Sequence, residues 1–299
     1  MANEFITLKN EVNIKLKINP KSPLLIKLGD GKESTKDENT ICFMTTKGGT
    51  AKYEKGIRIE NEDKREGDLY IPGSTLKGMF RERFHQIYYD YKGLDSQKLT
   101  EKSFDEYREI LLKDKELKSE DVYEKNLEID RLFGSTTLKG RFFAQDSIIN
   151  GKKTELNSLL KTRSITPIDR FTGGAVVPLN FEYTTEAFEG ELIIKNITKE
   201  ELQALYFVIR DSINGEIRLG NSKTRGFGQV ELEIKEFNLK LYRNNLDEFK
   251  ELHNYFEEDK ENSMKLGENY LYKGLKLKDK TVDVNNPNEF IKALFGGAK

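Results

Sequence analysis

The sequence predicts an α+β fold in which an antiparallel sheet carries helices, as in one elaborated or two smaller ferredoxin-like units. Segments with alternating apolar and polar residues stand beside segments whose apolar residues have helical spacing. Their order is strand, loop, helix and strand, and later strand, helix, glycine-rich loop and strand. This order lacks the regular β-α alternation of a doubly wound parallel sheet.

Four segments carry the period-two alternation of half-buried strands. They are residues 12–18, 176–183, 189–195 and 229–234, and residues 141–146 also have strand character. After residue 237 the pattern is looser, with a strand or hairpin expected at 270–282 and a short helix at 288–295.

Two helices are predicted from an apolar face. The first follows Ser74, a suitable N-cap residue, and its apolar face holds residues 76, 80, 84, 87 and 91. Lys77, Arg81 and His85 are spaced four apart and form another stripe on this helix. The second helix begins with a capping box formed by Thr198 and Glu201, and residues 202, 205, 206, 209 and 213 form its apolar face.

Length and composition limit the class of protein. The chain has 299 residues, enough for one large or two smaller domains, and its formal net charge is −1. Nucleic-acid binding must therefore come from local basic patches. The single cysteine, Cys42, excludes an intrachain disulfide, and with two histidines a Cys/His zinc site is disfavoured. No signal peptide or membrane span is apparent, so we expect a cytoplasmic protein without a membrane partner.

The run from Gly220 to Gly228 combines three glycines with Lys223 and Arg225, and with Arg218 before it forms a basic loop over residues 218–228. Glycine lets the backbone bend and lets a ligand approach closely, and cations beside turned-out amide groups suit phosphate. A strand follows this run, whereas a Walker or dinucleotide-binding loop would open a helix, so mononucleotide binding is disfavoured. A glycine-rich turn without a ligand is the alternative.

Two other loops share this basic character. Residues 73–81 place Lys77 and Arg81 at a helix start, which favours an anion, and residues 131–141 place Lys139 between two arginines. The aromatic residues that flank the three loops are Tyr70, Phe133, Phe142 and Phe227. Cations along a phosphate backbone and rings that stack on bases predict single-stranded RNA as the ligand. The alternative is solvated cations beside core aromatic residues.

Catalytic residues are harder to select. No Ser/His/Asp triad, HExxH or CxxC motif is present. His85 shares a helix stripe with two cations, but no oriented partner marks it as a general acid or base. The stretch from Asp30 to Asp68 holds many carboxylates that could bind Mg²⁺ for phosphodiester cleavage, although spacing selects none of them.

Four motifs in order resemble the RAMP superfamily of CRISPR-associated proteins. Residues 71–78, with the sequence IPGSTLKG, resemble its IPGSSLKG signature, and residues 131–134 its LFG element. Residues 168–173 are similar to its IDR-TG segment, and residues 220–228 to its glycine-rich loop. The resemblance extends from about residue 12 to residue 237 and leaves the C-terminal part unexplained.

The resemblance implies a modified ferredoxin-like (RRM-type) core over residues 1–240, with a helical insertion at 93–130, a projecting thumb-like segment at 160–185 and a C-terminal extension at 241–299. The chain looks most like a backbone subunit of a type III effector complex, which would bind CRISPR RNA, target RNA and other subunits. The RNA-binding candidates are Ser74, Lys77, Arg81, Lys139, Arg141, Arg163, Arg170, Ser222, Lys223, Arg225 and Gly226.

Many such subunits cleave target RNA with an aspartate in the loop before the first motif. The corresponding region, about residues 50–58, contains Glu54 but no aspartate, and Asp30 and Asp68 are the alternatives. Mg²⁺ is the implied cofactor, and no residue is assigned as its ligand. Two other hypotheses stay open: an RNA-processing endonuclease that cuts CRISPR repeats without metal through His85, and a capping or scaffold subunit without catalysis.

Overall fold

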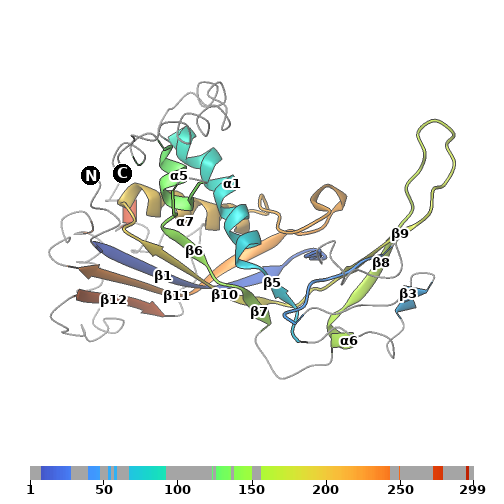
Figure 1. Ribbon diagram of the computed structural model, residues 1–299, viewed down its shortest axis with the longest axis horizontal. Helices are drawn as coiled ribbons and strands as arrows, with labels where there is room; N and C mark the ends of the chain where they lie inside the picture. The colour runs from blue at the N-terminus through green and yellow to red at the C-terminus, as the bar shows by residue number, and fades with distance from the viewer. Residues whose placement is uncertain are drawn as a thin grey trace, which may run out of the picture.

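The computed structural model describes residues 8–27, 40–47, 53–54, 57–58, 67–91, 123, 126–135, 138–149, 156–242, 249, 272–278 and 294–295. A seven-stranded sheet forms their centre (Figure 1). Its strand order is β12-β11-β1-β10-β7-β5, with β6 also paired to β10, and every pair is antiparallel. The strands are β1 (Asn10–Pro20), β5 (Tyr70–Ile71), β6 (Phe142–Ala144), β7 (Ser147–Ile149), β10 (Phe188–Lys195), β11 (Val230–Tyr242) and β12 (Tyr272–Lys278).

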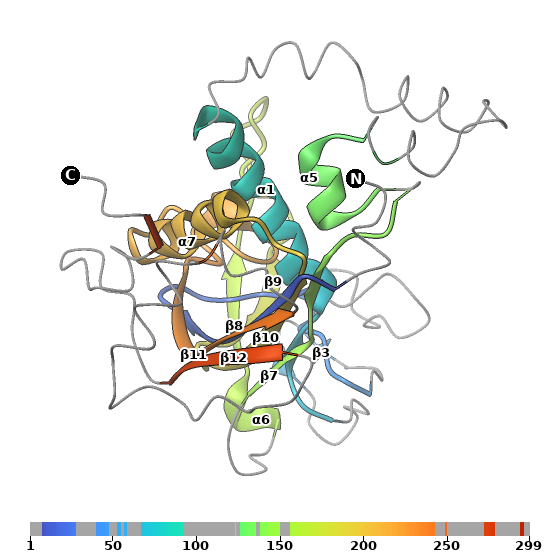
Figure 2. The ribbon, with the colours of Figure 1, turned by 90° about the vertical axis from the view of Figure 1, so that its left-hand side faces the viewer.

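Three helices lie on one face of this sheet: α1 (Gly73–Tyr91), α5 (Glu128–Phe133) and α7 (Lys199–Ile213) (Figure 2). On β1, Val12, Ile14, Leu16 and Ile18 are buried while Lys15 between them is exposed. Successive side chains of a strand point to opposite faces, so the apolar set packs under the helices. The predicted α+β fold with an antiparallel sheet is confirmed.

The start of α7 matches its prediction. The Thr198 side chain accepts a hydrogen bond from the Glu201 amide at 3.2 Å, and Glu201 Oε2 accepts one from the Thr198 amide at 2.9 Å. Ile197 and Leu202 on either side of this box are buried. The capping box therefore fixes where α7 begins and leaves its apolar face on the core.

On the opposite face of the sheet, lysines and glutamates of β1 and β11 form ion pairs. Lys15 pairs with Glu236 across β1 and β11 at 3.2 Å, and Lys240 pairs with Glu11 at 2.8 Å. Oppositely charged neighbours on adjacent strands stabilise a solvated sheet face. We call this surface the outer sheet face.

A second sheet, of order β2-β9-β8, supports a hairpin that projects from the molecule (Figure 1). It consists of β2 (Thr40–Ile41), β8 (Lys161–Ile165) and β9 (Leu179–Tyr183), and residues 166–178 form the tip of the hairpin. The strand predicted at 176–183 therefore begins only at Leu179. The remaining short elements are β3 (Tyr53–Glu54), β4 (Ile57–Arg58) and α6 (Leu156–Leu159).

The described C-terminal residues join the same core. Strand β12 pairs with β11 over seven residues, in agreement with the strand expected at 270–282. Gln203 Nε2 donates to the Leu294 carbonyl at 2.7 Å, and the Phe295 ring packs on Phe207 with centroids 5.1 Å apart. Of the helical insertion predicted at 93–130, the structure describes only Tyr123 and residues 126–130, and the last three of these begin α5.

Candidate nucleic-acid interface

The N-terminal end of α1 is closed by a carboxylate of the chain itself. The helix begins at Gly73, so the predicted N-cap role of Ser74 is wrong, and Ser74 is exposed in the first turn. The Gly73 amide donates to Asp146 Oδ1 at 2.7 Å, and the Thr75 amide donates to the Pro72 carbonyl. Asp146 therefore takes the position at the helix start where a phosphate was predicted.

The predicted stripe of Lys77, Arg81 and His85 runs along α1 on the side of α5. Arg81 donates through Nη2 to Asp130 Oδ1 at 2.5 Å and through Nη1 to the Gly134 carbonyl at 3.0 Å. Lys77 has no carboxylate partner among the described residues, and its pKa is lowered by partial burial and by the charge of Arg81. The stripe therefore contains one neutralised cation and one that lacks an anion.

Arg81 and His85 line a cleft of about 430 Å³ between α1 and α5, which we call the α1–α5 cleft. Burial of Asp130 raises the pKa of its carboxyl, against the effect of Arg81, which lowers it. The other residues that line this cleft are Gly78, Glu82, Gln86, Leu127 and Ile129.

His85, which lines the α1–α5 cleft, is predicted to make the free energy of unfolding depend on pH. Burial and the charge of Arg81 lower the pKa of His85 below its ordinary value of 6.5, while Asp130 acts in the opposite direction. Between the lowered pKa and 6.5 the folded protein binds fewer protons than the unfolded chain, so the free energy of unfolding falls as the pH falls through this window. Asp130, whose pKa is raised, acts with the opposite sign at lower pH.

We therefore expect urea unfolding between about pH 7.5 and about pH 5.5 to show a loss of stability that is smaller in His85→Gln. NMR titration of the His85 ring should give a pKa below 6.5. An identical pH profile in the variant would show that His85 contributes nothing to it.

Gly78 lies in the interior of α1 and is exposed. A Cβ added there would meet no atom within 4 Å in the part of the chain that the structure describes. By contrast, a Cβ on Gly73 would collide with the Ala144 carbonyl oxygen. Glycine in a helix interior costs about 1 kcal/mol relative to alanine, and at Gly78 neither packing nor a positive φ within the described chain accounts for it.

The glycine-rich loop between α7 and β11 is held against the segment that follows β1. The amides of Asn221 and Gly228 donate to the carbonyls of Leu25 and Pro23 at 2.9 and 2.8 Å. Gly228 has a φ of +81°, and a Cβ there would collide with the Leu219 carbonyl oxygen. Between these points residues Lys223–Arg225 form a single 3₁₀ turn, whose Thr224 and Arg225 are exposed.

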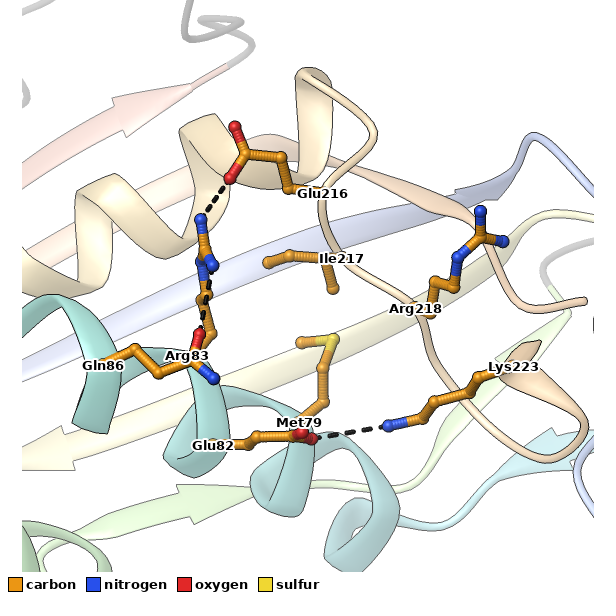
Figure 3. A pocket seen from close by; sticks show the side chains of 8 residues that line it. All are labelled: Met79, Glu82, Arg83, Gln86, Glu216, Ile217, Arg218 and Lys223. Atoms are coloured by element: carbon orange, nitrogen blue, oxygen red, sulfur yellow. Dashed lines mark hydrogen bonds and ion pairs between the residues drawn. The ribbon is translucent and has the colours of Figure 1, made fainter. Parts of the chain in front are cut away.

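A second cleft, of about 190 Å³, separates α1 from this loop, and we call it the α1–loop cleft (Figure 3). Met79 and Ile217 are buried at its floor. Lys223 Nζ lies 3.4 Å from Glu82 Oε2 across the cleft, and Arg83 forms ion pairs with Asp211 and Glu216. Because the Lys223–Glu82 pair is exposed, it stabilises the loop by at most about 1 kcal/mol.

The glycine-rich loop also contacts the base of the projecting hairpin. The Arg225 guanidinium lies 5.5 Å from the centroid of Phe181 in β9, and the Arg163 guanidinium of β8 lies 5.7 Å from that of Phe227. Phe181 and Phe227 are buried beneath these cations, with centroids 5.7 Å apart. The prediction that Phe227 stacks on bases is therefore wrong, since its ring belongs to the core.

The tip of the hairpin is ordered by its own hydrogen bonds. Asp169 Oδ1 accepts from the amides of Phe171 and Thr172 at 2.7 and 3.0 Å, which lowers the pKa of Asp169. Phe171 is fully exposed, and Arg170 beside it has no carboxylate partner in the described chain. The other large exposed apolar residues of the tip are Ile168, Val176 and Val177.

The predicted basic loop at 131–141 contacts α1 through Gly134, but Arg141 and Lys139 in it do not face the glycine-rich loop. Arg141 is 5 % exposed and pairs with Glu201 at 2.6 Å, so its prediction as an RNA-binding residue is wrong. Phe133 and Phe142 are buried and pack on each other, so they do not stack on bases either. Lys139 lies 5.9 Å from the ring of Phe143.

Phe143 follows Phe142 in β6, and neighbouring side chains of a strand point to opposite faces. Phe142 faces the helices, where it packs on Phe80. Lys139 therefore lies on the outer sheet face, away from the glycine-rich loop.

The family model of the RAMP superfamily matches residues 17–231, well over half of the chain. The chain belongs to the RAMP superfamily of CRISPR-associated proteins. A CRISPR-associated, RNA-binding role goes with this family. The comparison with curated proteins gave no significant match. Among the described residues of this RAMP protein, no helix combines the length and the apolar character that crossing a bilayer requires.

The described part of this RAMP protein contains no group of three His, Cys, Asp or Glu side chains that could hold a metal ion. Asp68 is exposed, and its backbone pairs with Thr46. Asp30 and the side chain of Glu54 lie outside the described residues. The described residues therefore do not fit Mg²⁺, and the catalytic role of these three carboxylates stays a prediction.

Two residues of the interface were absent from the RNA-binding candidates. Arg218 donates to the Phe227 carbonyl at 3.3 Å and has no carboxylate partner in the described chain. It lies at the start of the basic loop predicted at residues 218–228, so its position in the sequence was the signal that could have added it to the candidates. Phe171 lies in the IDR-TG segment, but its exposure depends on the Asp169 turn, which spacing does not reveal.

Proposed function

We propose that this RAMP protein binds single-stranded CRISPR RNA as a backbone subunit of a type III effector complex in antiviral defence. One observation carries the proposal: α1, the glycine-rich loop and the base of the hairpin form a continuous surface, joined by the Lys223–Glu82 and Arg225–Phe181 contacts. The cations on it that lack carboxylate partners in the described chain are Lys77, Arg163, Arg218 and Arg225. Such cations are suited to phosphate groups.

The arrangement of the core supports a ferredoxin-like (RRM-type) unit. Strands β1, β6, β10 and β11, with α1 after β1 and α7 after β10, have the βαββαβ order along the chain. In the sheet their order is β11-β1-β10-β6, all antiparallel, with both helices on one face. In this unit the glycine-rich loop leads into the last strand, on the helix side of the sheet.

The projecting hairpin supports the thumb proposed for residues 160–185. Its tip carries Arg170 and the exposed ring of Phe171 at the end of two strands that leave the body of the molecule (Figure 1). A cation beside an exposed aromatic ring is suited to phosphate and to stacking on a base. We propose that the hairpin meets guide and target RNA or a neighbouring subunit.

RNA cleavage is not included in this proposal. No described cluster of carboxylates supports metal-dependent cleavage, and His85 has Arg81 beside it but no hydrogen bond in the described chain that orients its ring. Incubation of labelled RNA with the protein, with Mg²⁺ and with a chelator, separates the two enzymatic hypotheses from the capping or scaffold subunit.

Salt-dependent RNA binding tests the proposal. We expect the protein to bind an unstructured single-stranded RNA in fluorescence anisotropy. Lys77→Ala and Arg225→Ala should each weaken the affinity and reduce the slope of log K against log salt by about 0.7, since each loses one phosphate contact.

Lys15→Ala is the matched control. It also removes one positive charge, but from the outer sheet face, where Lys15 pairs with Glu236. We expect its salt slope to match that of the unmodified protein. No RNA affinity at low salt, or equal losses in all three variants, would refute the proposed binding surface.

A further inference from the structure

Two clefts flank a single exposed ridge of α1. The α1–α5 cleft lies on one side and the α1–loop cleft on the other, and Glu82 and Gln86 line both of them. Gly78, Glu82 and Gln86 are spaced four apart and are all exposed, so they form the ridge between the clefts. At Gly78 the ridge carries no side chain.

Positively charged side chains lie on both sides of Gly78. Lys77 lies beside Gly78 on the stripe that faces α5, and Lys223 reaches α1 from the glycine-rich loop. Lys77 has no carboxylate partner in the described chain, and Lys223 has only its exposed contact with Glu82. A phosphate could therefore approach either lysine without breaking a buried ion pair.

We propose that the RNA strand crosses α1 at Gly78, with its sugar–phosphate backbone against the bare turn of the helix. On one side of the crossing a phosphate pairs with Lys77. On the other side a phosphate pairs with Lys223, whose exposed ion pair with Glu82 is replaced by this contact. Glu82, one turn further along the ridge, repels phosphate and restricts the crossing to the Gly78 turn. This path rests on the proposed RNA binding and adds the residue that sets how closely the strand approaches.

The proposed path gives a reason for Gly78, which neither packing nor backbone conformation requires in the described part of the fold. Because a Cβ at position 78 would meet none of the described residues within 4 Å, the position is open to a ligand on that part of the surface, and close approach of a ligand is one established use of glycine. Any longer side chain on the ridge would stand between the helix and the strand, although it would leave Lys77 and Lys223 in place.

A graded series at one position tests the path. We expect Gly78→Ala to raise the thermal unfolding temperature, because alanine favours the helix. Gly78→Gln should keep or raise that temperature, and it should weaken binding of the unstructured RNA at least tenfold in fluorescence anisotropy. The decisive result is a Gly78→Gln variant with an equal or higher unfolding temperature but a lower RNA affinity. A variant that only damaged the fold would lower both the unfolding temperature and the RNA affinity.

Outcomes for the path and for the proposed function are distinguishable. If the unmodified protein binds RNA and Gly78→Gln binds equally well, the crossing is wrong while the RNA-binding surface stands. If the unmodified protein binds no RNA, the proposed function fails first. If Gly78→Gln melts early, Gly78→Ala decides: a stable alanine variant with full RNA affinity overturns the path, and one with reduced affinity supports it.

Discussion

Replacement of Arg141 by alanine is expected to lower the free energy of unfolding by about 3–5 kcal/mol, because it leaves a buried carboxylate without its partner. Arg141 Nη2 lies 2.6 Å from Glu201 Oε1, and both side chains are nearly inaccessible. The same guanidinium also donates to the carbonyls of Arg131 and Asn196. One side chain thus connects the end of α5 with the capping box that starts α7. Urea unfolding followed by circular dichroism measures the loss.

Lys139→Ala provides the comparison for Arg141. It removes the same charge two residues away, where the side chain is exposed, and should change stability by less than about 0.5 kcal/mol. The double variant Arg141→Met with Glu201→Gln should recover part of the loss, because no charge is then left buried. A stable Arg141→Ala protein with weakened RNA binding would reinstate the RNA-binding prediction for Arg141.

A second large loss of stability, about 3–5 kcal/mol, is expected for Phe227→Ala. The Phe227 ring is fully buried, with centroids 5.7 Å from Phe181 and 6.2 Å from Tyr183. Its removal leaves a cavity at the junction of the glycine-rich loop and the hairpin, so RNA affinity should fall with stability. Thermal unfolding and fluorescence anisotropy measure the two effects.

Two variants separate packing from base stacking at Phe227. Phe227→Leu keeps most of the apolar volume and should recover much of the stability, although leucine cannot stack on a base as phenylalanine does. Phe171→Ala removes the exposed ring at the hairpin tip and should leave stability within about 0.5 kcal/mol. If Phe227→Ala lost RNA binding at unchanged stability, Phe227 would have to be reassigned as a stacking residue.

The local patterns of the sequence predicted the elements better than the burial of individual side chains. Apolar periodicity located β1, α1, α7, β10 and β11, and the Thr198 capping box was confirmed in both of its hydrogen bonds. These features depend on neighbours within a few residues. The predicted cap at Ser74 failed because Asp146, which is distant in sequence, supplies the acceptor at the start of α1.

The RNA interface stays a prediction, but the structure shows which of its candidate residues lie together and which are buried. Basic residues beside glycines predict three converging loops, and both partner loops do contact α1: Lys223 reaches Glu82, and Arg81 donates to the Gly134 carbonyl. In the loop at 131–141, however, Arg141 pairs with Glu201 inside the protein and Lys139 lies on the outer sheet face. Arg141 and the aromatic residues Phe133, Phe142 and Phe227 are buried. A cation beside a ring gives the same sequence pattern whether the pair meets a ligand or covers the core, and only tertiary packing distinguishes the two.

The balanced charges of the outer sheet face have a consequence for how the protein responds to its ionic surroundings. Lys15 and Lys240 are each matched by a glutamate on the adjoining strand, so the β1–β11 part of this face offers a polyanion little net attraction from these two lysines. Added salt should therefore loosen a polyanion bound on the helix side, while it should leave contacts made by the paired β1–β11 part of the opposite side almost unchanged.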